Sequence, residues 1–418
     1  MVNLRSNNDA LVLRHQPYGE YHPYIPLPFE RMPRNPASGE VIVLNIETEH
    51  NQSVQSVWCL WSAEGKDLSS RIDAVAISKD ESLDHWQVFL PSFSGCETVH
   101  YRLFAENKNQ KTESEEFSFL VSSWIKVNSI ISVEDTDNKL DIRLSTERSG
   151  LYLRLLIEPD SGKSLSLKLL AVQETSLTTS TLTSFSKVWD DLEITLKNGP
   201  FSFELSRKSD GLQLKTQRPL KVLVNVDGEV LQYHLCFESP ADEAFYGFGE
   251  RFNALNQRGN HLDNYVYGQY TSQGKRTYIP VPFFISSRGY GLWMKTDRQA
   301  EFDMAAARPD SWAITGHAEG DSNLELKFFV QPQPFEIVKA FTDLTGKPKL
   351  PPTWMFGLWM SSNDWNSQAE VIKQLHETQK QGIPASVLVI EAWSDEMTFY
   401  IWNDALYQKN LHLKPWLY

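Results

Sequence analysis

Polar and aromatic side chains follow an apolar run late in the chain. Asn363, Asp364 and Trp365 come just after the run from Trp354 to Met360. An indole ring can stack on the apolar face of a pyranose while amide and carboxylate groups bond its hydroxyls, so this combination suits a sugar pocket. The alternative is a purely structural role, in which these residues lead into a helix and the tryptophan is buried in a small core.

A second apolar run, Ser386 to Glu391, ends in a carboxylate and is followed by Trp393. Trp393 is a further candidate for sugar stacking, with a weaker claim than Trp365. Trp359 has a weaker claim, because it lies inside the first run and is expected to belong to the core. Asp395 and Glu396 stand close to Glu391, but clustered loop carboxylates are more typical of a polar rim than of a catalytic set.

The residues between the two runs predict a helix. Ser367 can cap the helix while Glu370 reaches back to the amide of the cap residue, and Val371 begins an apolar stripe at helical spacing. Gly382 suits a left-handed cap, and Pro384 blocks continuation of the helix. Strand, helix and strand in this order form a right-handed crossover unit, the building block of a parallel barrel.

Upstream of this unit the pattern is that of β-strands. Residues 1–38 are rich in Pro, Asn and Arg and look like a lead-in segment, and residues 39–123 are predicted to form a small immunoglobulin-like sandwich. Its short alternating apolar runs recur at the spacing of a β-sandwich: 41–46, 57–61, 72–77, 86–90, 99–104 and 117–121.

Residues 124–346 predict a second, larger sandwich. Its strands alternate cleanly around the turn pairs Asn198-Gly199, Asp210-Gly211 and Asp227-Gly228, which favour tight hairpins. A short helix from about Pro334 to Thr345 then leads to residues 347–418, the predicted start of the barrel.

The composition excludes several classes of partner. The chain has 418 residues, 41% of them hydrophobic and 22% charged, as in ordinary globular proteins. A net charge of −13 without stripes of Lys or Arg disfavours nucleic acids and anionic membranes and fits a neutral ligand. The first residues show no continuous apolar stretch, and the three cysteines do not suggest a disulfide framework, so a cytoplasmic protein is expected.

No cofactor or metal is predicted. The segment Gly247-Phe-Gly-Glu-Arg251 has Phe252 where a dinucleotide fingerprint needs a third glycine, and no crossover helix follows. His376-Glu377 lacks the second histidine of a zinc-binding helix. Neither a nucleophile elbow nor a phosphate-binding loop is present in the sequence.

Four segments together resemble glycoside hydrolase family 31, over roughly residues 125–405: Phe245–Phe252, Tyr278–Phe284, Pro351–Trp354 and Ile383–Val387. The resemblance implies a galactose-mutarotase-like β-sandwich followed by a (β/α)8 barrel. It also implies hydrolysis of α-linked sugars with retention, which needs two carboxyl groups about 5–5.5 Å apart. The expected ligand is therefore an α-linked oligosaccharide or glycoside.

The resemblance also suggests roles for single residues. An aspartate that bonds sugar hydroxyls is common in the family where this chain has Glu391, so the longer side chain leaves the preferred sugar open. The loop 257–277, which in the family reaches over the barrel mouth, carries Tyr267, with Asn264, Tyr265 and Tyr270 as neighbours. Tyr267 is expected to contact substrate, the alternative being a tyrosine-rich surface hairpin. Glu250 and Arg251 are expected to form a structural network rather than to perform chemistry.

The two catalytic aspartates of the family follow the fourth and sixth barrel strands. Only roughly 70 residues follow Pro351, whereas a closed barrel takes about 250. The nucleophile and acid/base are therefore expected beyond Tyr418, in a truncated reading frame or in a complementing carboxy-terminal chain. The alternative is a non-catalytic carbohydrate-binding or assembly module built from the two sandwiches.

Overall fold

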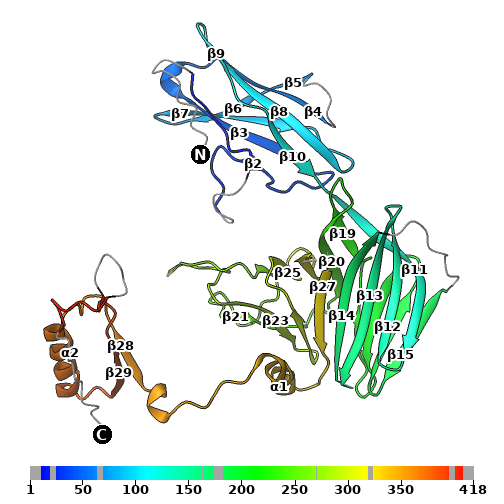
Figure 1. The fold of residues 1–418 in the computed structure, drawn as a ribbon, viewed down its shortest axis with the longest axis vertical. Coiled ribbons are helices and arrows are strands. Elements are labelled where there is room, and N and C mark those ends of the chain that lie inside the picture. Colours follow the sequence, from blue (N-terminus) through cyan, green and yellow to red (C-terminus); the bar gives the residue numbers. More distant parts are fainter. Residues whose placement is uncertain are drawn as a thin grey trace. The chain divides into compact units, whose positions relative to one another are not determined.

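The computed structural model describes residues 11–18, 25–63, 69–161, 163–173, 182–269, 271–318, 323–394 and 401–407 (Figure 1). The chain forms two units, residues 1–341 and residues 342–418. The first unit is built almost entirely of strands, and the predicted predominance of β-structure is confirmed. None of the helices in the described ranges is long and apolar enough to cross a membrane.

The first unit begins with a sandwich of two five-stranded sheets (Figure 1). One sheet contains β1 (Leu13–Arg14), β2 (Arg31–Met32), β3 (Ile42–Glu49), β6 (Val75–Lys79) and β7 (Leu83–Leu90), and the other contains β4 (Ser56–Ala63), β5 (Ser70–Asp73), β8 (Glu97–Glu106), β9 (Lys111–Glu113) and β10 (Phe117–Val121). Alternate residues of both sheets, such as Ile42, Leu44, Val57 and Tyr101, point inward and form one apolar core.

Two sequence-based expectations about this sandwich need correction. The run 72–77 is not one strand, because β5 pairs with β4 in one sheet and β6 pairs with β7 in the other. The chain changes sheets at Ala74, whose amide donates to the Val57 carbonyl (2.8 Å). The segment treated as a lead-in also takes part in the fold: it supplies β1 and β2, and Leu11 is buried in the core.

The larger sandwich combines a 13-stranded and a four-stranded antiparallel sheet. The 13-stranded sheet has the order β21-β23-β24-β27-β14-β13-β12-β11-β19-β20-β26-β25-β22. These strands are β11 (Ser123–Thr136), β12 (Lys139–Thr146), β13 (Leu151–Ser161), β14 (Ser164–Gln173), β19 (Lys221–Val224), β20 (Val230–Glu238), β21 (Phe245–Gly249), β22 (Asn260–Asp263), β23 (Pro280–Ser286), β24 (Tyr290–Met294), β25 (Ala300–Met304), β26 (Ser311–His317) and β27 (Asn323–Phe329). The smaller sheet consists of β15 (Ser184–Trp189), β16 (Leu192–Lys197), β17 (Ser202–Arg207) and β18 (Leu212–Lys215).

One large core fills this sandwich. It contains side chains of both sheets, among them Ile194 and Leu205 of the smaller one. At its centre the ring of Trp312 stacks on that of Phe237, with 4.3 Å between ring centroids. The three predicted turn pairs each join consecutive antiparallel strands, and each glycine has a positive φ, as tight hairpins require.

Helix α1 spans Pro334–Thr345, as the sequence predicted. Ile337 is fully buried against Phe283 and Phe329, and the ring of Phe341 stacks on Phe283 with centroids 4.0 Å apart. Gly346 has a φ of 105°, which fits its expected place just after the helix.

The second unit contains one parallel crossover unit (Figure 1). A 3-10 turn, η2 (Thr353–Phe356), precedes β28 (Leu358–Ser361), and helix α2 (Gln368–Lys380) leads to β29 (Ala385–Val389). The predicted strand 354–360 is therefore wrong in its first half. Pro352 accepts a bond from the Met355 amide (3.0 Å) and starts the turn, so the strand begins only after Gly357.

Candidate functional site

Helix α2 holds β28 and β29 in parallel register through both of its ends. The Ser367 side chain accepts a hydrogen bond from the Glu370 amide, as predicted. The predicted return bond from the Glu370 carboxylate to the cap amide is absent among the described residues. That carboxylate instead accepts a bond from Gln374 Nε2 (2.7 Å), one turn further along the helix.

The carboxyl end of α2 is closed by a Schellman motif. Gly382 has a φ of 65° and donates to the Gln379 carbonyl (3.0 Å), and the Ile383 amide donates to the Thr378 carbonyl (3.1 Å). The chain therefore turns back directly into β29. Val371 is the buried residue of the helix.

The predicted site residues of this unit follow the carboxyl ends of the two strands. In a parallel pair these ends lie at one edge of the sheet, which is where barrel enzymes build their sites. Asn363, Asp364 and Glu391 are exposed to solvent there, whereas Trp365 and Trp393 are half-buried. The structure thus places five of the six predicted residues in the two loops that leave one sheet edge.

Hydrogen bonds order the loop after β28. The amide of Asp364 donates to the Ser362 hydroxyl (3.2 Å), and the amide of Trp365 donates to the Ser362 carbonyl (3.2 Å). These bonds turn the chain sharply, so that its carboxylate and indole follow the strand within a few residues.

The segment 401–407 connects the two loops. The Tyr407 hydroxyl donates to the carbonyl of Trp365 (3.1 Å), and the Asn403 amide donates to the carbonyl of Trp393 (2.9 Å). The rings of Trp393 and Trp402 stack with centroids 6.1 Å apart, and Tyr407 packs against Trp402 at 5.2 Å. Trp402 and Tyr407 were not among the predicted site residues, although aromatic residues so soon after Trp393 were a signal that could have been followed.

Trp359 does not lie in a core within the described residues. Its side chain is 48% exposed, and its indole Nε1 donates to the Met355 carbonyl (3.0 Å). The ring lies 6.3 Å from that of Trp354. The expectation of a buried Trp359 is therefore wrong for the part of the chain that the structure describes, because about half of its side chain is open to solvent.

Tyr267 belongs to the first unit, on the loop between β22 and β23. Its amide donates to the Thr277 carbonyl (2.8 Å), its hydroxyl donates to Gln269, and the Arg276 guanidinium lies 4.8 Å from the centre of its ring. Asn264 has a structural role, since its side chain forms hydrogen bonds with the backbone of Arg298 and Ala300.

Close packing of the backbone explains why glycine stands at positions 247 and 249. β21 pairs with β23 through a register shift between Gly247 and Gly249. A Cβ at Gly249 would lie 2.0 Å from the Ile279 carbonyl oxygen, and one at Gly247 would lie 2.8 Å from the Phe283 carbonyl oxygen. These glycines therefore permit a close approach of two strands rather than the binding of a phosphate.

Arg251 has the structural role that the sequence predicted. Its guanidinium donates to the carbonyls of Phe248 (2.9 Å), Lys275 (2.7 Å) and Asp263 (2.6 Å). It thereby ties both ends of the loop that carries Tyr267 to the end of β21.

No metal site emerges from the described residues. Among them no group of three or more His, Cys, Asp or Glu side chains could hold a metal ion. Asp395, Glu396 and Tyr270 lie outside the described residues. What the sheet edge offers is a set of exposed hydrogen-bond acceptors beside half-buried indoles.

Comparison with known protein families decides the classification. The family model described as the glycosyl hydrolase 31 N-terminal galactose mutarotase-like domain matches residues 97–303, and the glycosyl hydrolases family 31 TIM-barrel domain matches residues 348–414. The chain belongs to glycoside hydrolase family 31. A further model, described as Lmo2446-like, N-terminal, matches residues 14–86.

Two similar proteins are an isomaltosyltransferase and an isomaltosidase. The isomaltosyltransferase of Sporosarcina globispora is 32% identical over 94% of this chain, which covers 37% of that protein. The 1,3-alpha-isomaltosidase of Kribbella flavida is 36% identical over 38% of this chain and 22% of its own length. The chain thus spans little more than a third of the length of that isomaltosyltransferase.

Solved structures of the family agree with this fold. The cycloalternan-forming enzyme from Listeria monocytogenes, solved in complex with a pentasaccharide substrate, has a TM-score of 0.79 at 30% identity and covers 94% of this chain and 38% of its own. The cycloalternan-degrading enzyme from Trueperella pyogenes, at 23% identity and a TM-score of 0.60, supports the fold alone. The predicted mutarotase-like sandwich and barrel start are both confirmed by the family models.

Proposed function

We propose that this chain provides the sandwich domains and the first sugar-binding loops of a family 31 enzyme that acts on α-linked oligosaccharides. The observation that carries the proposal is the shared edge of β28 and β29, where Asp364 and Glu391 stand exposed beside Trp365 and Trp393. The names of the relatives, an isomaltosyltransferase and an isomaltosidase, support isomaltosyl-containing substrates.

Each residue of this edge has a distinct role in the proposal. The Asp364 and Glu391 carboxylates accept hydrogen bonds from sugar hydroxyls, and the Asn363 amide can both donate and accept. Trp365 and Trp393 present indole faces to the apolar side of a pyranose, with Trp393 backed by the ring of Trp402. Tyr267 remains a proposed substrate contact, with one side of its ring taken by Arg276.

Turnover requires more of the barrel than the two described strands. Retaining cleavage needs a nucleophile and an acid/base in carboxyl groups about 5–5.5 Å apart on opposite sides of the scissile bond. We propose that further barrel strands supply this pair, within one longer protein or in a complementing chain, and that these 418 residues alone bind sugar without cleaving it.

A turnover assay tests the catalytic half of the proposal. The purified chain is incubated with nitrophenyl α-glucoside, α-xyloside and α-isomaltoside, and no release of nitrophenol is expected. Co-expression with a segment carrying the remaining strands of a family 31 barrel is expected to give release. Turnover by the isolated chain would contradict the proposed absence of the catalytic pair.

Calorimetric titration with isomaltotriose tests the binding half. Asp364→Asn combined with Glu391→Gln removes two charged acceptors without changing the size of the side chains, and we expect Kd to rise at least ten-fold. Glu377→Gln is the matched control, because Glu377 is an exposed carboxylate on α2 and away from the edge. Equal binding by all three proteins would refute the assignment of the sheet edge.

A further inference from the structure

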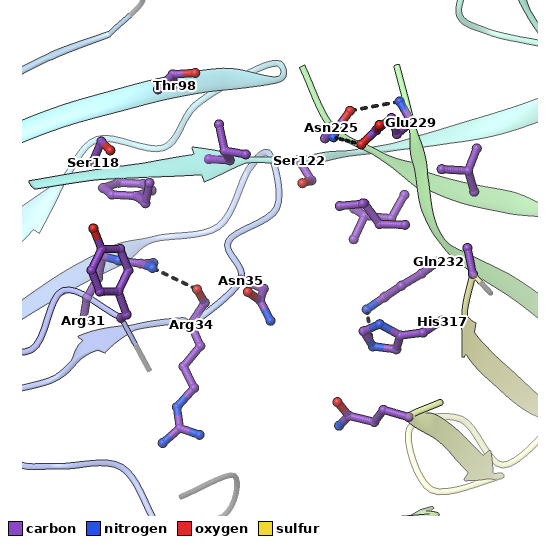
Figure 2. Close-up of a pocket in the computed structure, with 18 residues that line it drawn as sticks. Arg31, Arg34, Asn35, Thr98, Ser118, Ser122, Asn225, Glu229, Gln232 and His317 are labelled. Carbon is purple, nitrogen blue, oxygen red and sulfur yellow. Dashed lines mark hydrogen bonds between the residues drawn. The ribbon is translucent and has the colours of Figure 1, made fainter. Parts of the chain in front are cut away.

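The first unit contains a cleft far along the sequence from the barrel loops. It has a volume of about 1020 Å³ and lies between the small sandwich and the outer face of the 13-stranded sheet (Figure 2). Its lining draws on the segment before β3, on β8 and β10, and on β19, β20 and the ends of β25 and β26. A volume of this size lies at the upper end of ligand pockets.

Strand register fixes one wall of the cleft. Leu223 of β19 faces Gln232 of β20, which in turn faces His317 of β26, so the three side chains form one row across three strands. The residues that alternate with them, Val222 and Tyr233, belong to the core, so this row points away from it. Figure 2 shows Gln232 and His317 joined by a hydrogen bond, which measures 2.9 Å between Nε2 atoms.

The opposite wall belongs to the small sandwich and is tied to the first wall. Ser118 and Leu120 of β10 line it, and the chain runs directly from β10 through Ser122 into β11. The Ser38 amide donates to the Ser122 carbonyl (2.7 Å), and Cys96 Sγ donates to the Val224 carbonyl (3.3 Å). These two bonds tie the small sandwich to the connection at Ser122 and to β19.

The charged side chains that line the cleft already interact with other groups of the protein. Arg31 donates to the carbonyls of Pro17, Pro33 and Arg34 at 2.7–3.0 Å, and its guanidinium lies 4.5 Å from the centre of the Phe119 ring. Arg34 pairs with Glu30, and Glu229 accepts a bond from Asn225 Nδ2 (2.9 Å). Burial lowers the pKa of His317, which favours its neutral form.

The neutral polar side chains are the ones left for a ligand. Asn35, Thr98, Ser118 and Gln299 line the cleft and make no side-chain hydrogen bond within the ranges that the structure describes. Exposed apolar surface accompanies them, since Tyr18, Leu120 and Leu231 are 50%, 45% and 36% exposed. Amides and hydroxyls beside small apolar patches match a molecule with many hydroxyls and C–H faces, and they offer little to an anion or a cation.

We propose that this cleft is a second, non-catalytic binding site for a neutral oligosaccharide. The choice of an α-linked oligosaccharide rests on the proposed function, whereas the neutral, hydroxyl-rich chemistry rests on the lining alone. A site here would tether a long substrate to the enzyme and so raise its effective concentration.

Hydrogen exchange with isomaltotetraose as the probe locates the site. The protein used is the full chain with the Asp364→Asn and Glu391→Gln changes, so that the barrel loops do not dominate binding. Addition of the sugar is expected to slow exchange in peptides covering 118–122 and 223–232. An unchanged exchange rate in both peptides would overturn the inference.

Substitution at Leu231 provides the second measurement. Leu231→Glu places an unpaired carboxylate on the cleft wall and is expected to raise the Kd for isomaltotetraose at least ten-fold, while Leu231→Met is expected to bind like the parent. Glu238→Gln, an exposed change at the other end of β20, is the control. If only Asp364→Asn with Glu391→Gln abolishes binding, the proposed function stands and the cleft is excluded as a site. If only Leu231→Glu abolishes binding, the cleft stands and the barrel loops are excluded as the binding site.

Discussion

Gly249 occupies a position where one added carbon atom meets the backbone of the neighbouring strand. Gly249 and Gly259 both have a positive φ, 86° and 82°, but only Gly249 has neighbours within reach of a Cβ. The two positions therefore separate the cost of the backbone conformation from the cost of the close approach.

We predict that Gly249→Ala lowers the free energy of unfolding by at least about 3 kcal/mol, because a Cβ 2.0 Å from the Ile279 carbonyl oxygen forces β21 and β23 apart. Gly259→Ala should cost only the conformational part, about 1 kcal/mol. Urea unfolding of both variants measures the difference. Equal losses would mean that the strands separate without penalty.

Tyr407 is a positioning residue for the barrel loops, since its hydroxyl bonds the Trp365 carbonyl. We predict that Tyr407→Phe destabilises this unit by about 1 kcal/mol, the worth of one hydrogen bond. It should also weaken isomaltotriose binding a few-fold, because the loop that carries Asp364 is less well held. Calorimetry reports the binding and thermal melting reports the stability, and a change in melting alone would limit Tyr407 to a structural role.

At the scale of elements, α2 shows how a short helix can position a site that it does not itself form. Its cap at Ser367 and its Schellman motif fix the two ends of the helix, and the motif turns the chain directly into β29.

We predict that Ser367→Ala costs about 1 kcal/mol of local stability, because the Glu370 amide loses its acceptor. Ser367→Asn, which keeps an acceptor at the cap, should retain most of that stability. Hydrogen exchange of the amides from Glu370 to Leu375 measures both. Equal protection in Ser367→Ala and the parent would show that packing on the sheet, not the cap, holds the helix.

At the scale of the whole molecule, two histidines make the folding stability of the first unit depend on pH. Burial lowers the pKa of His15 to about 4, despite its bond to the Asn45 carbonyl (2.7 Å). Burial, with Lys221 and Arg218 nearby, lowers the pKa of His234 to about 4. Between pH 6.5 and pH 4 the unfolded chain therefore binds more protons at these residues than the folded chain does.

Stability is accordingly predicted to be full above pH 6.5 and to fall as the pH drops toward 4, by up to about 3 kcal/mol for each histidine. His15→Gln and His234→Gln should each flatten this part of the profile, and the double variant should flatten it most. Urea unfolding at steps between pH 7.5 and pH 4.5 tests the expectation. A parent profile that stays level over this range would contradict it.

Local patterns in the sequence were sufficient for much of this architecture. Alternation of apolar residues predicted strands in both sandwiches, the Asn-Gly and Asp-Gly pairs predicted hairpins, and Ser367 and Gly382 predicted the ends of α2. Each of these signals acts between residues that are close in the chain. The candidate residues after β28 and β29 could be named for the same reason, since a strand end is a local feature.

Long-range pairing decided the rest. The division of residues 72–77 between two sheets, the contact of Tyr407 with Trp365, and the row formed by Leu223, Gln232 and His317 each depend on which distant strand or loop lies alongside. Periodicity states which face of a strand is apolar, but not what that face meets. A polar cleft made from hydroxyls and amides of segments far apart in the chain can therefore be recognised only after the sheets have taken their order.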